Sequence, residues 1–238
     1  VGSFTVDGVD HYLFWLDVLD CLQPGCHIVL AHIVGSVAMQ KWDELGIHFD
    51  AITTGFLASE EQAKMVAHYC REQAEQGTEI FVDPVMGDYG RLYSGANEGT
   101  VRCMREMLGV AHLCFPNYTE ACLLADVLYK EEGMTETEAY VLVDKLRAFG
   151  SQSVLITTCI VDQQHAVVGY NHFNNEHFLL PYEEIPVQFP GTGDIFSSII
   201  VGRLRDGDCL RHATRTAMDI LRNWIDINKD NEDKNRGI

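Results

Sequence analysis

A glycine-rich turn that opens a helix is the strongest chemical signal in the sequence. It reads Pro-Gly-Thr-Gly-Asp-Ile-Phe-Ser-Ser from Pro190, and Gly191 and Gly193 allow neighbouring backbone N–H groups to converge on one anion. Asp194 follows in the first helical turn, where a carboxylate can accept the proton of an attacking hydroxyl group. These residues suit the binding of a transferring phosphoryl group, although glycine and aspartate are also common at the start of an ordinary helix.

Further polar clusters follow other predicted strands. Asp83 ends one apolar run and Asp88 comes a few residues later, and two such acids could bind a hydrated Mg²⁺ that neutralises nucleotide phosphates. Glu120 comes just after the next strand, and Thr157 and Thr158 end a third strand with hydroxyl groups that could contact phosphate oxygens. Each cluster alone could be a turn or a helix cap, but their shared position at strand ends indicates one site.

Short apolar runs alternate with longer amphipathic runs along most of the chain. The apolar runs predict strands, and the runs with apolar residues at helical spacing predict helices. The predicted strands cover residues 28–32, 49–54, 79–83, 111–116 and 153–158, and the predicted helices cover residues 59–76, 97–108, 119–128, 135–149, 191–204 and 210–224. Residues 33–39 are expected to begin one more helix, which is cut short by the segment that starts at Trp42.

This alternation predicts a doubly wound α/β fold, with a mostly parallel sheet and helices on both faces. Ligands in such folds bind at the carboxyl ends of the strands. Residues 166–188 interrupt the alternation, because two strand-like runs flank Asn174-Asn175, and they predict an antiparallel hairpin. Residues 1–238 are expected to form a single domain, in which residues 1–27 stay unassigned and residues 228–238 form a mobile polar tail.

The composition limits the partners and the compartment. The 238 residues include 35 acidic and 17 basic side chains, and the formal net charge of -18 would repel nucleic acids and anionic membrane surfaces. No apolar run approaches the about 20 residues that span a bilayer. The eight cysteines include no Cys-x-x-Cys pair and several lie in apolar runs, which is typical of free thiols, so we expect a cytoplasmic protein.

Taken together, the motifs resemble those of a known family. Asp-Pro-Val-Met-Gly-Asp from Asp83, Pro-Asn-x-x-Glu from Pro116 and Gly-Thr-Gly-Asp from Gly191 have the order and spacing of the pyridoxal kinase branch of the ribokinase-like family. The resemblance covers roughly residues 28–224. It implies a ribokinase-like fold, a homodimer, ATP and Mg²⁺ as cofactors with a monovalent cation as a further candidate, and phosphorylation of the 5′-hydroxymethyl group of pyridoxal, pyridoxine or pyridoxamine.

By position, the resemblance also implies roles for individual residues. Asp194 would be the catalytic base, in an anion hole formed by Gly191, Thr192 and Gly193. Asp83 and Glu120 would organise Mg²⁺ and the phosphates. The implied nucleotide contacts are Asn117, Thr157, Thr158, Val187 and Phe189, and the implied vitamer contacts are Gly35, Ser36, Asp88 and Tyr93.

The region before Trp42 departs from the family pattern. The family has a flap there with a Thr-Ala-type turn and several contacts to the substrate ring, and this sequence shows no such motif. Two other functions therefore stay open. One is a hydroxymethylpyrimidine kinase of thiamine metabolism, which uses the same anion hole, and the other is a vitamer-binding protein with weak catalysis.

Overall fold

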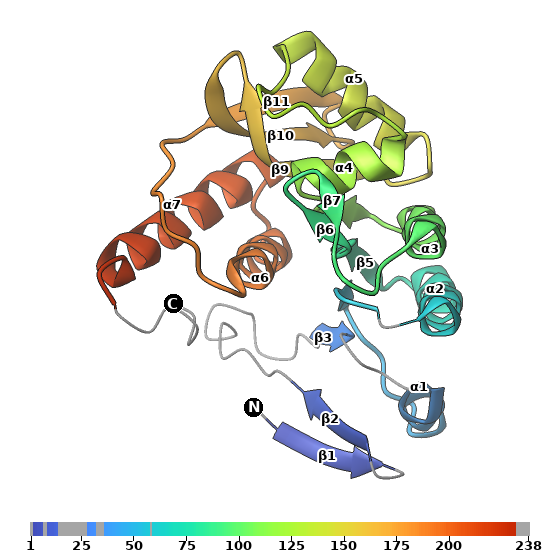
Figure 1. Ribbon diagram of the computed structural model, residues 1–238. Helices are drawn as coiled ribbons and strands as arrows, with labels where there is room; N and C mark the ends of the chain where they lie inside the picture. Colours follow the sequence, from blue (N-terminus) through green and yellow to red (C-terminus); the bar gives the residue numbers. More distant parts are fainter. Residues whose placement is uncertain (1, 7–8, 14–27, 32–35, 58, 232–238) are drawn as a thin grey trace.

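The computed structural model describes residues 2–6, 9–13, 28–31, 36–57 and 59–231 (Figure 1). Its main sheet has seven strands in the order β11-β10-β9-β8-β5-β4-β3. The parallel strands are β3 (Ile28–Ala31), β4 (Ala51–Thr54), β5 (Glu79–Val82), β8 (Leu113–Cys114) and β9 (Ser153–Val161). The predicted hairpin is confirmed, because β10 (Gln164–Asn171) pairs antiparallel with β11 (Glu176–Pro181), and on its other side β10 pairs antiparallel with β9.

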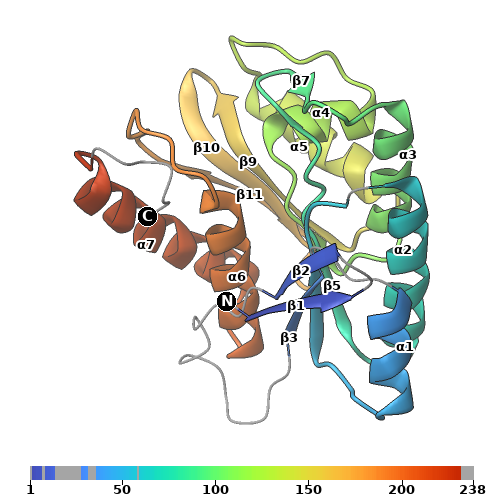
Figure 2. The ribbon, with the colours of Figure 1, turned by 60° about the horizontal axis from the view of Figure 1, so that its bottom comes forward.

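Helices cover both faces of this sheet (Figure 2). One face carries α1 (Ser36–Glu44), α2 (Glu60–Glu75), α3 (Glu98–Leu108), α4 (Tyr118–Ala125) and α5 (Glu136–Arg147), and the other carries α6 (Thr192–Arg205) and α7 (Leu210–Asn228). Two small hairpins lie outside the main sheet: β1 (Gly2–Val6) with β2 (Val9–Leu13), and β6 (Gly87–Asp88) with β7 (Arg91–Leu92). The doubly wound α/β fold is therefore confirmed.

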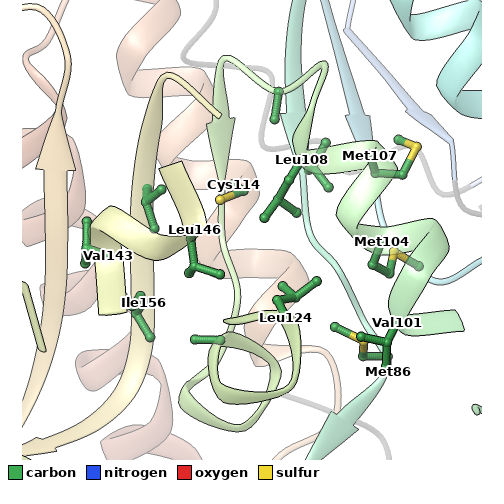
Figure 3. Close-up of a cluster of buried hydrophobic side chains, with 14 of the residues drawn as sticks. Met86, Val101, Met104, Met107, Leu108, Cys114, Leu124, Val143, Leu146 and Ile156 are labelled. Atoms are coloured by element: carbon green, nitrogen blue, oxygen red, sulfur yellow. The ribbon is translucent and has the colours of Figure 1, made fainter. Parts of the chain in front are cut away.

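The core has two halves because strand side chains alternate between the faces of the sheet. In β5, Ile80 and Val82 pack under α2 to α5, whereas Phe81 packs under α6 and α7. Figure 3 shows part of the first half, where Leu146 of α5 and Met104 of α3 are fully buried. Met86 lies in the same cluster, so the loop after β5 is anchored in the core.

The structure corrects several predicted boundaries. The helix expected to stop before Trp42 continues as α1 to Glu44, because the Trp42 ring packs against Phe49 with ring centroids 5.2 Å apart. Helix α4 ends at Ala125, since Asp126 takes a left-handed conformation with φ of 52°. Helix α7 extends past residue 224 to Asn228, so the expected tail begins inside a helix, and its residues 232–238 lie outside the described residues.

Across the described residues, none of the helices has the length and apolar character needed to cross a membrane. The thiols in this part of the chain form no disulfides. Cys209 is exposed. The buried thiols are those of Cys70, Cys103, Cys114, Cys122 and Cys159.

Candidate active site

The amino end of α6 is open to an anion. Helices α2 to α5 each begin with a residue whose side chain accepts a first-turn N–H group. Helices α6 and α7 have no such side-chain bond. The residue before α6 is Gly191, which has no side chain to accept one and takes a left-handed conformation with φ of 84°. The first-turn N–H groups of α6 and its dipole are therefore available to a ligand.

Asp83 faces this helix end from the carboxyl end of β5. A Cβ atom built on Gly193 would lie 4.0 Å from Oδ2 of Asp83, which is its nearest neighbour, so the carboxylate and the helix border the same space. Burial raises the pKa of Asp83, and the nearby carboxylate of Asp194 raises it further. The structure thus brings Asp83 close to Gly193 and Asp194.

Glu120 lies beside Asp83 but is engaged with the backbone. It is 3% exposed, and its Oε1 and Oε2 accept the N–H groups of Met86 at 3.0 Å and Asn117 at 2.9 Å. Burial raises the pKa of Glu120 and the charge of Asp83 adds to the effect, which indicates that the two carboxylates are close. Glu120 therefore holds the loop after β5 while adding negative charge to the site.

Asn117 has a structural task as well. Its Oδ1 accepts the N–H of Glu120 at 2.9 Å, and its Nδ2 donates to the carbonyl of Gly87 at 2.9 Å. Asn117 and Glu120 thus form a capping box, in which each side chain accepts a backbone N–H group of the other residue.

A pocket of about 320 Å³ opens beside Gly193, between the middle of β9, the loop after β11, and helices α6 and α7. The prediction that Thr157 and Thr158 end their strand is wrong, because β9 continues to Val161 and pairs there with β10. Five of the predicted site residues line it: Thr157, Thr158, Val187, Thr192 and Gly193. Phe189 is not among the lining residues; it is 5% exposed, and its carbonyl accepts the Thr192 hydroxyl at 3.3 Å. The pocket has the size and the mixed apolar and polar lining of a small-molecule site.

Sequence reasoning missed the wall of this pocket that α7 supplies. Met218, Leu221 and Ile225 line it, and their helical spacing is the same pattern that core packing produces. The loop residues Tyr182 and Ile185 also line it, and no motif marks them. Only the position of this loop just before the glycine-rich turn could have indicated a role.

Two more predicted residues, Asp88 and Tyr93, lie on or near the β6–β7 hairpin. Asp88 is half-buried, and its Oδ1 accepts the N–H of Tyr89 at 2.8 Å. Tyr93 is 44% exposed and lines a second cavity of about 120 Å³ together with Phe56, which sequence reasoning did not select. Burial raises the pKa of Tyr93, and the carboxylates of Asp88, Glu120 and Asp83 raise it further, so the phenol faces the acidic site.

The predicted ring-binding loop is only partly described. Ser36 begins α1, and Gly35 lies outside the described residues.

The fold and the site define an α/β protein that presents an open helix end and clustered carboxylates at the carboxyl edge of a parallel sheet. A family model described as phosphomethylpyrimidine kinase matches residues 31–237. The chain belongs to this family.

Known relatives fit the same assignment. Pyridoxal kinase PdxY of Paraburkholderia phymatum is 31% identical over 175 residues, which cover 69% of this chain and 58% of that protein. A crystal structure from Bacteroides thetaiotaomicron, assigned as a phosphomethylpyrimidine kinase and containing pyridoxal, is 33% identical with a TM-score of 0.79, covering 84% of this chain and 71% of that one. Pyridoxal kinase from Leishmania donovani, in complex with ADP and pyridoxamine, is 25% identical with a TM-score of 0.66, and the match covers 80% of this chain and 69% of that one. The chain spans between 48% and 58% of the first three curated relatives that it matches.

Proposed function

We propose that this protein transfers the γ-phosphoryl group of ATP to the 5′-hydroxymethyl group of pyridoxal, pyridoxine or pyridoxamine. The observation that carries the proposal is the space shared by the amino end of α6, Asp83 and Asp194 next to a pocket of about 320 Å³. Phosphoryl transfer needs mainly positioning and stabilisation of negative charge, and both are available at such a helix end.

Asp194 is the proposed catalytic base. It lies in the first turn of α6, where its carboxylate can accept the proton of the attacking hydroxyl group. Gly191, Thr192 and Gly193 form the proposed anion hole, because their N–H groups belong to the uncapped start of the helix.

The acidic residues suit Mg²⁺. Mg²⁺ is usually bound through one or two carboxylates, with phosphate and water oxygens completing its shell. Asp83 offers hard oxygen ligands. Burial and the proximity of other carboxylates raise the pKa values of Asp83 and Glu120, and a bound cation would offset this repulsion. We propose that Asp83 is the direct ligand and that Glu120 acts through the loop it holds; the bound ion supplies charge neutralisation to the phosphates.

The pocket is the proposed nucleotide site. Thr157, Thr158 and Val187 line it and support the expected contacts, and the ADP complex of the Leishmania donovani relative supports a nucleotide at this fold. Asn117 and Phe189 act indirectly in this proposal. Asn117 caps α4, and the carbonyl of Phe189 accepts the hydroxyl group of Thr192.

Asp88 and Tyr93 are the proposed vitamer contacts, since both belong to the hairpin region at the acidic edge. Ser36, at the start of α1, and Gly35 stay proposed ring contacts on the family resemblance alone.

The family description favours one second function, a hydroxymethylpyrimidine kinase with the same anion hole. The family resemblance also supports a homodimer, and the buried free thiols support a reducing compartment such as the cytoplasm.

The test is product analysis with purified protein, Mg²⁺ and ATP, offering pyridoxal and hydroxymethylpyrimidine in parallel. Formation of pyridoxal phosphate at the higher kcat/KM is the expected result. Preferential phosphorylation of hydroxymethylpyrimidine would contradict the proposed substrate and favour a hydroxymethylpyrimidine kinase. Binding of pyridoxal without any product would contradict the kinase proposal and favour a vitamer-binding protein.

A further inference from the structure

The β6–β7 hairpin has a tightly specified turn. Gly87 pairs with Leu92 and Asp88 with Arg91, and the two turn residues, Tyr89 and Gly90, have φ angles of 50° and 74°. Two successive positive φ angles are those of the type I′ turn, which matches the twist of a two-residue hairpin.

The first turn of α4 holds this hairpin by its backbone. Glu120 accepts the N–H of Met86, Asn117 donates to the carbonyl of Gly87, and Oγ1 of Thr119 accepts the N–H of Gly90 at 2.9 Å. The first two bonds hold the base of the hairpin, whereas the Thr119 bond holds its tip. Thr119 is only 2% exposed, so this acceptor is fixed in position.

The hairpin tip also rests on an aromatic ring. A Cβ atom on Gly90 would lie 2.7 Å from Cδ1 of Tyr129, so the backbone of Gly90 already contacts this ring closely. Tyr129 in turn packs against Tyr118 of α4, with ring centroids 5.0 Å apart. Thr119 and Tyr129 thus form a seat for the tip of the hairpin.

The seated tip adjoins a proposed vitamer contact. Asp88 directly precedes the two turn residues, and its Oδ1 accepts the N–H of Tyr89 at 2.8 Å. The N–H of Tyr93 donates to the carbonyl of Met86 at 2.9 Å, so the chain on either side of the hairpin is held together at its base. Displacement of the tip would therefore move Asp88 relative to the acidic site.

We propose that Thr119 is a positioning residue, which holds the β6–β7 hairpin over the active site through the Gly90 N–H group. This role rests on the proposed kinase function, because the groups that the hairpin carries are the proposed vitamer contacts. Thr119 itself contacts no substrate; it acts through Gly90.

The test variant is Thr119→Val, which keeps the branched shape and removes the acceptor. Thr119→Ser restores the hydroxyl group. Thr137→Val is a matched control, because Thr137 is the second residue of α5, just as Thr119 is of α4, in a helix with the same kind of capping box, but its side chain is exposed.

Two readouts are independent of activity: hydrogen exchange of the Gly90 amide, and trypsin cleavage after Arg91, which is exposed on β7. One hydrogen bond of ordinary strength shifts an opening equilibrium about 2- to 10-fold, so Thr119→Val is expected to raise both rates by that factor. A fall of similar size in kcat/KM for pyridoxal should accompany it. Thr119→Ser should restore wild-type values, and Thr137→Val should match them.

Unchanged exchange and cleavage rates in Thr119→Val would contradict the claim that Thr119 holds the tip of the hairpin. Faster exchange with unaltered kcat/KM would overturn the positioning role. If the wild-type protein phosphorylates neither substrate, the proposed function fails, while the exchange and cleavage rates still decide whether Thr119 holds the hairpin.

Discussion

Gly193→Ala separates the anion hole from ordinary helix capping. Gly193 is the second residue of α6, its φ is not positive, and the nearest atom to an added Cβ is Oδ2 of Asp83 at 4.0 Å. The methyl group therefore fits without overlap. Replacing a glycine at an unstrained site stabilises a protein by about 0.4–1 kcal/mol, so the free energy of unfolding should stay constant or rise.

Turnover should change in the opposite direction. The added methyl group points into the space between α6 and Asp83, where the transferring phosphoryl group would bind. Loss of one oxyanion contact costs about 10²- to 10³-fold in kcat, and we expect Gly193→Ala to lose at least the lower value.

Two glycines that flank this helix provide a matched pair, with Gly207 as the control for Gly191. Gly191 and Gly207 lie at opposite ends of α6 with φ angles of 84° and 94°, and neither has an atom within 4 Å of an added Cβ. Alanine in the left-handed region costs about 1–2 kcal/mol, so both variants should lose similar stability. Only Gly191→Ala should also lose turnover, because only Gly191 borders the site.

The assays are urea denaturation followed by circular dichroism, and ADP release with pyridoxal as acceptor. The reasoning is refuted if Gly193→Ala keeps wild-type turnover. It is also refuted if Gly207→Ala lowers kcat as much as Gly191→Ala does.

Two further predictions concern the metal and the pH dependence. Asp83→Asn should raise the Mg²⁺ concentration needed for half-maximal turnover without unfolding the protein; an unchanged requirement would remove Asp83 from the metal site. His112 accepts the N–H of Ile80 through Nδ1 at 3.0 Å, and burial lowers its pKa from 6.5. The folded state thus disfavours the proton, and the free energy of unfolding should fall as the pH drops below 6.5. His112→Asn keeps an acceptor in a similar place but does not titrate. Its urea midpoint should therefore change less with pH below 6.5 than that of the wild type. An equally steep change would contradict the role of His112 in the pH dependence.

The strand ends and the glycine-rich turn could be predicted because their signals are local. Asp83 directly follows a short apolar run, and in a parallel sheet such residues must share one edge. The capping box from Asn117 to Glu120 is also local, but the same residue types suit a ligand site, so the sequence does not separate the two roles.

Other features depend on contacts between distant residues. Met218 and Leu221 of α7 line the pocket, but their spacing does not distinguish a pocket wall from a core. Thr119 and Gly90 are separated by 29 residues, and nothing in either segment specifies the other. The length of α1 was misjudged because the packing of Trp42 against Phe49 and Tyr69, which favours the helix, is tertiary.

The most direct test of the central claim is the turnover of Asp194→Asn, measured together with its affinity for ATP. Asn keeps the size of the side chain and can still serve at a helix start, but it cannot take the proton of the attacking hydroxyl group. General-base catalysis contributes about 10²- to 10⁴-fold, so kcat should fall by a factor in that range while ATP binding stays near wild type. Wild-type turnover in Asp194→Asn would contradict the account, because α6 would then begin with an ordinary helix turn rather than a catalytic site.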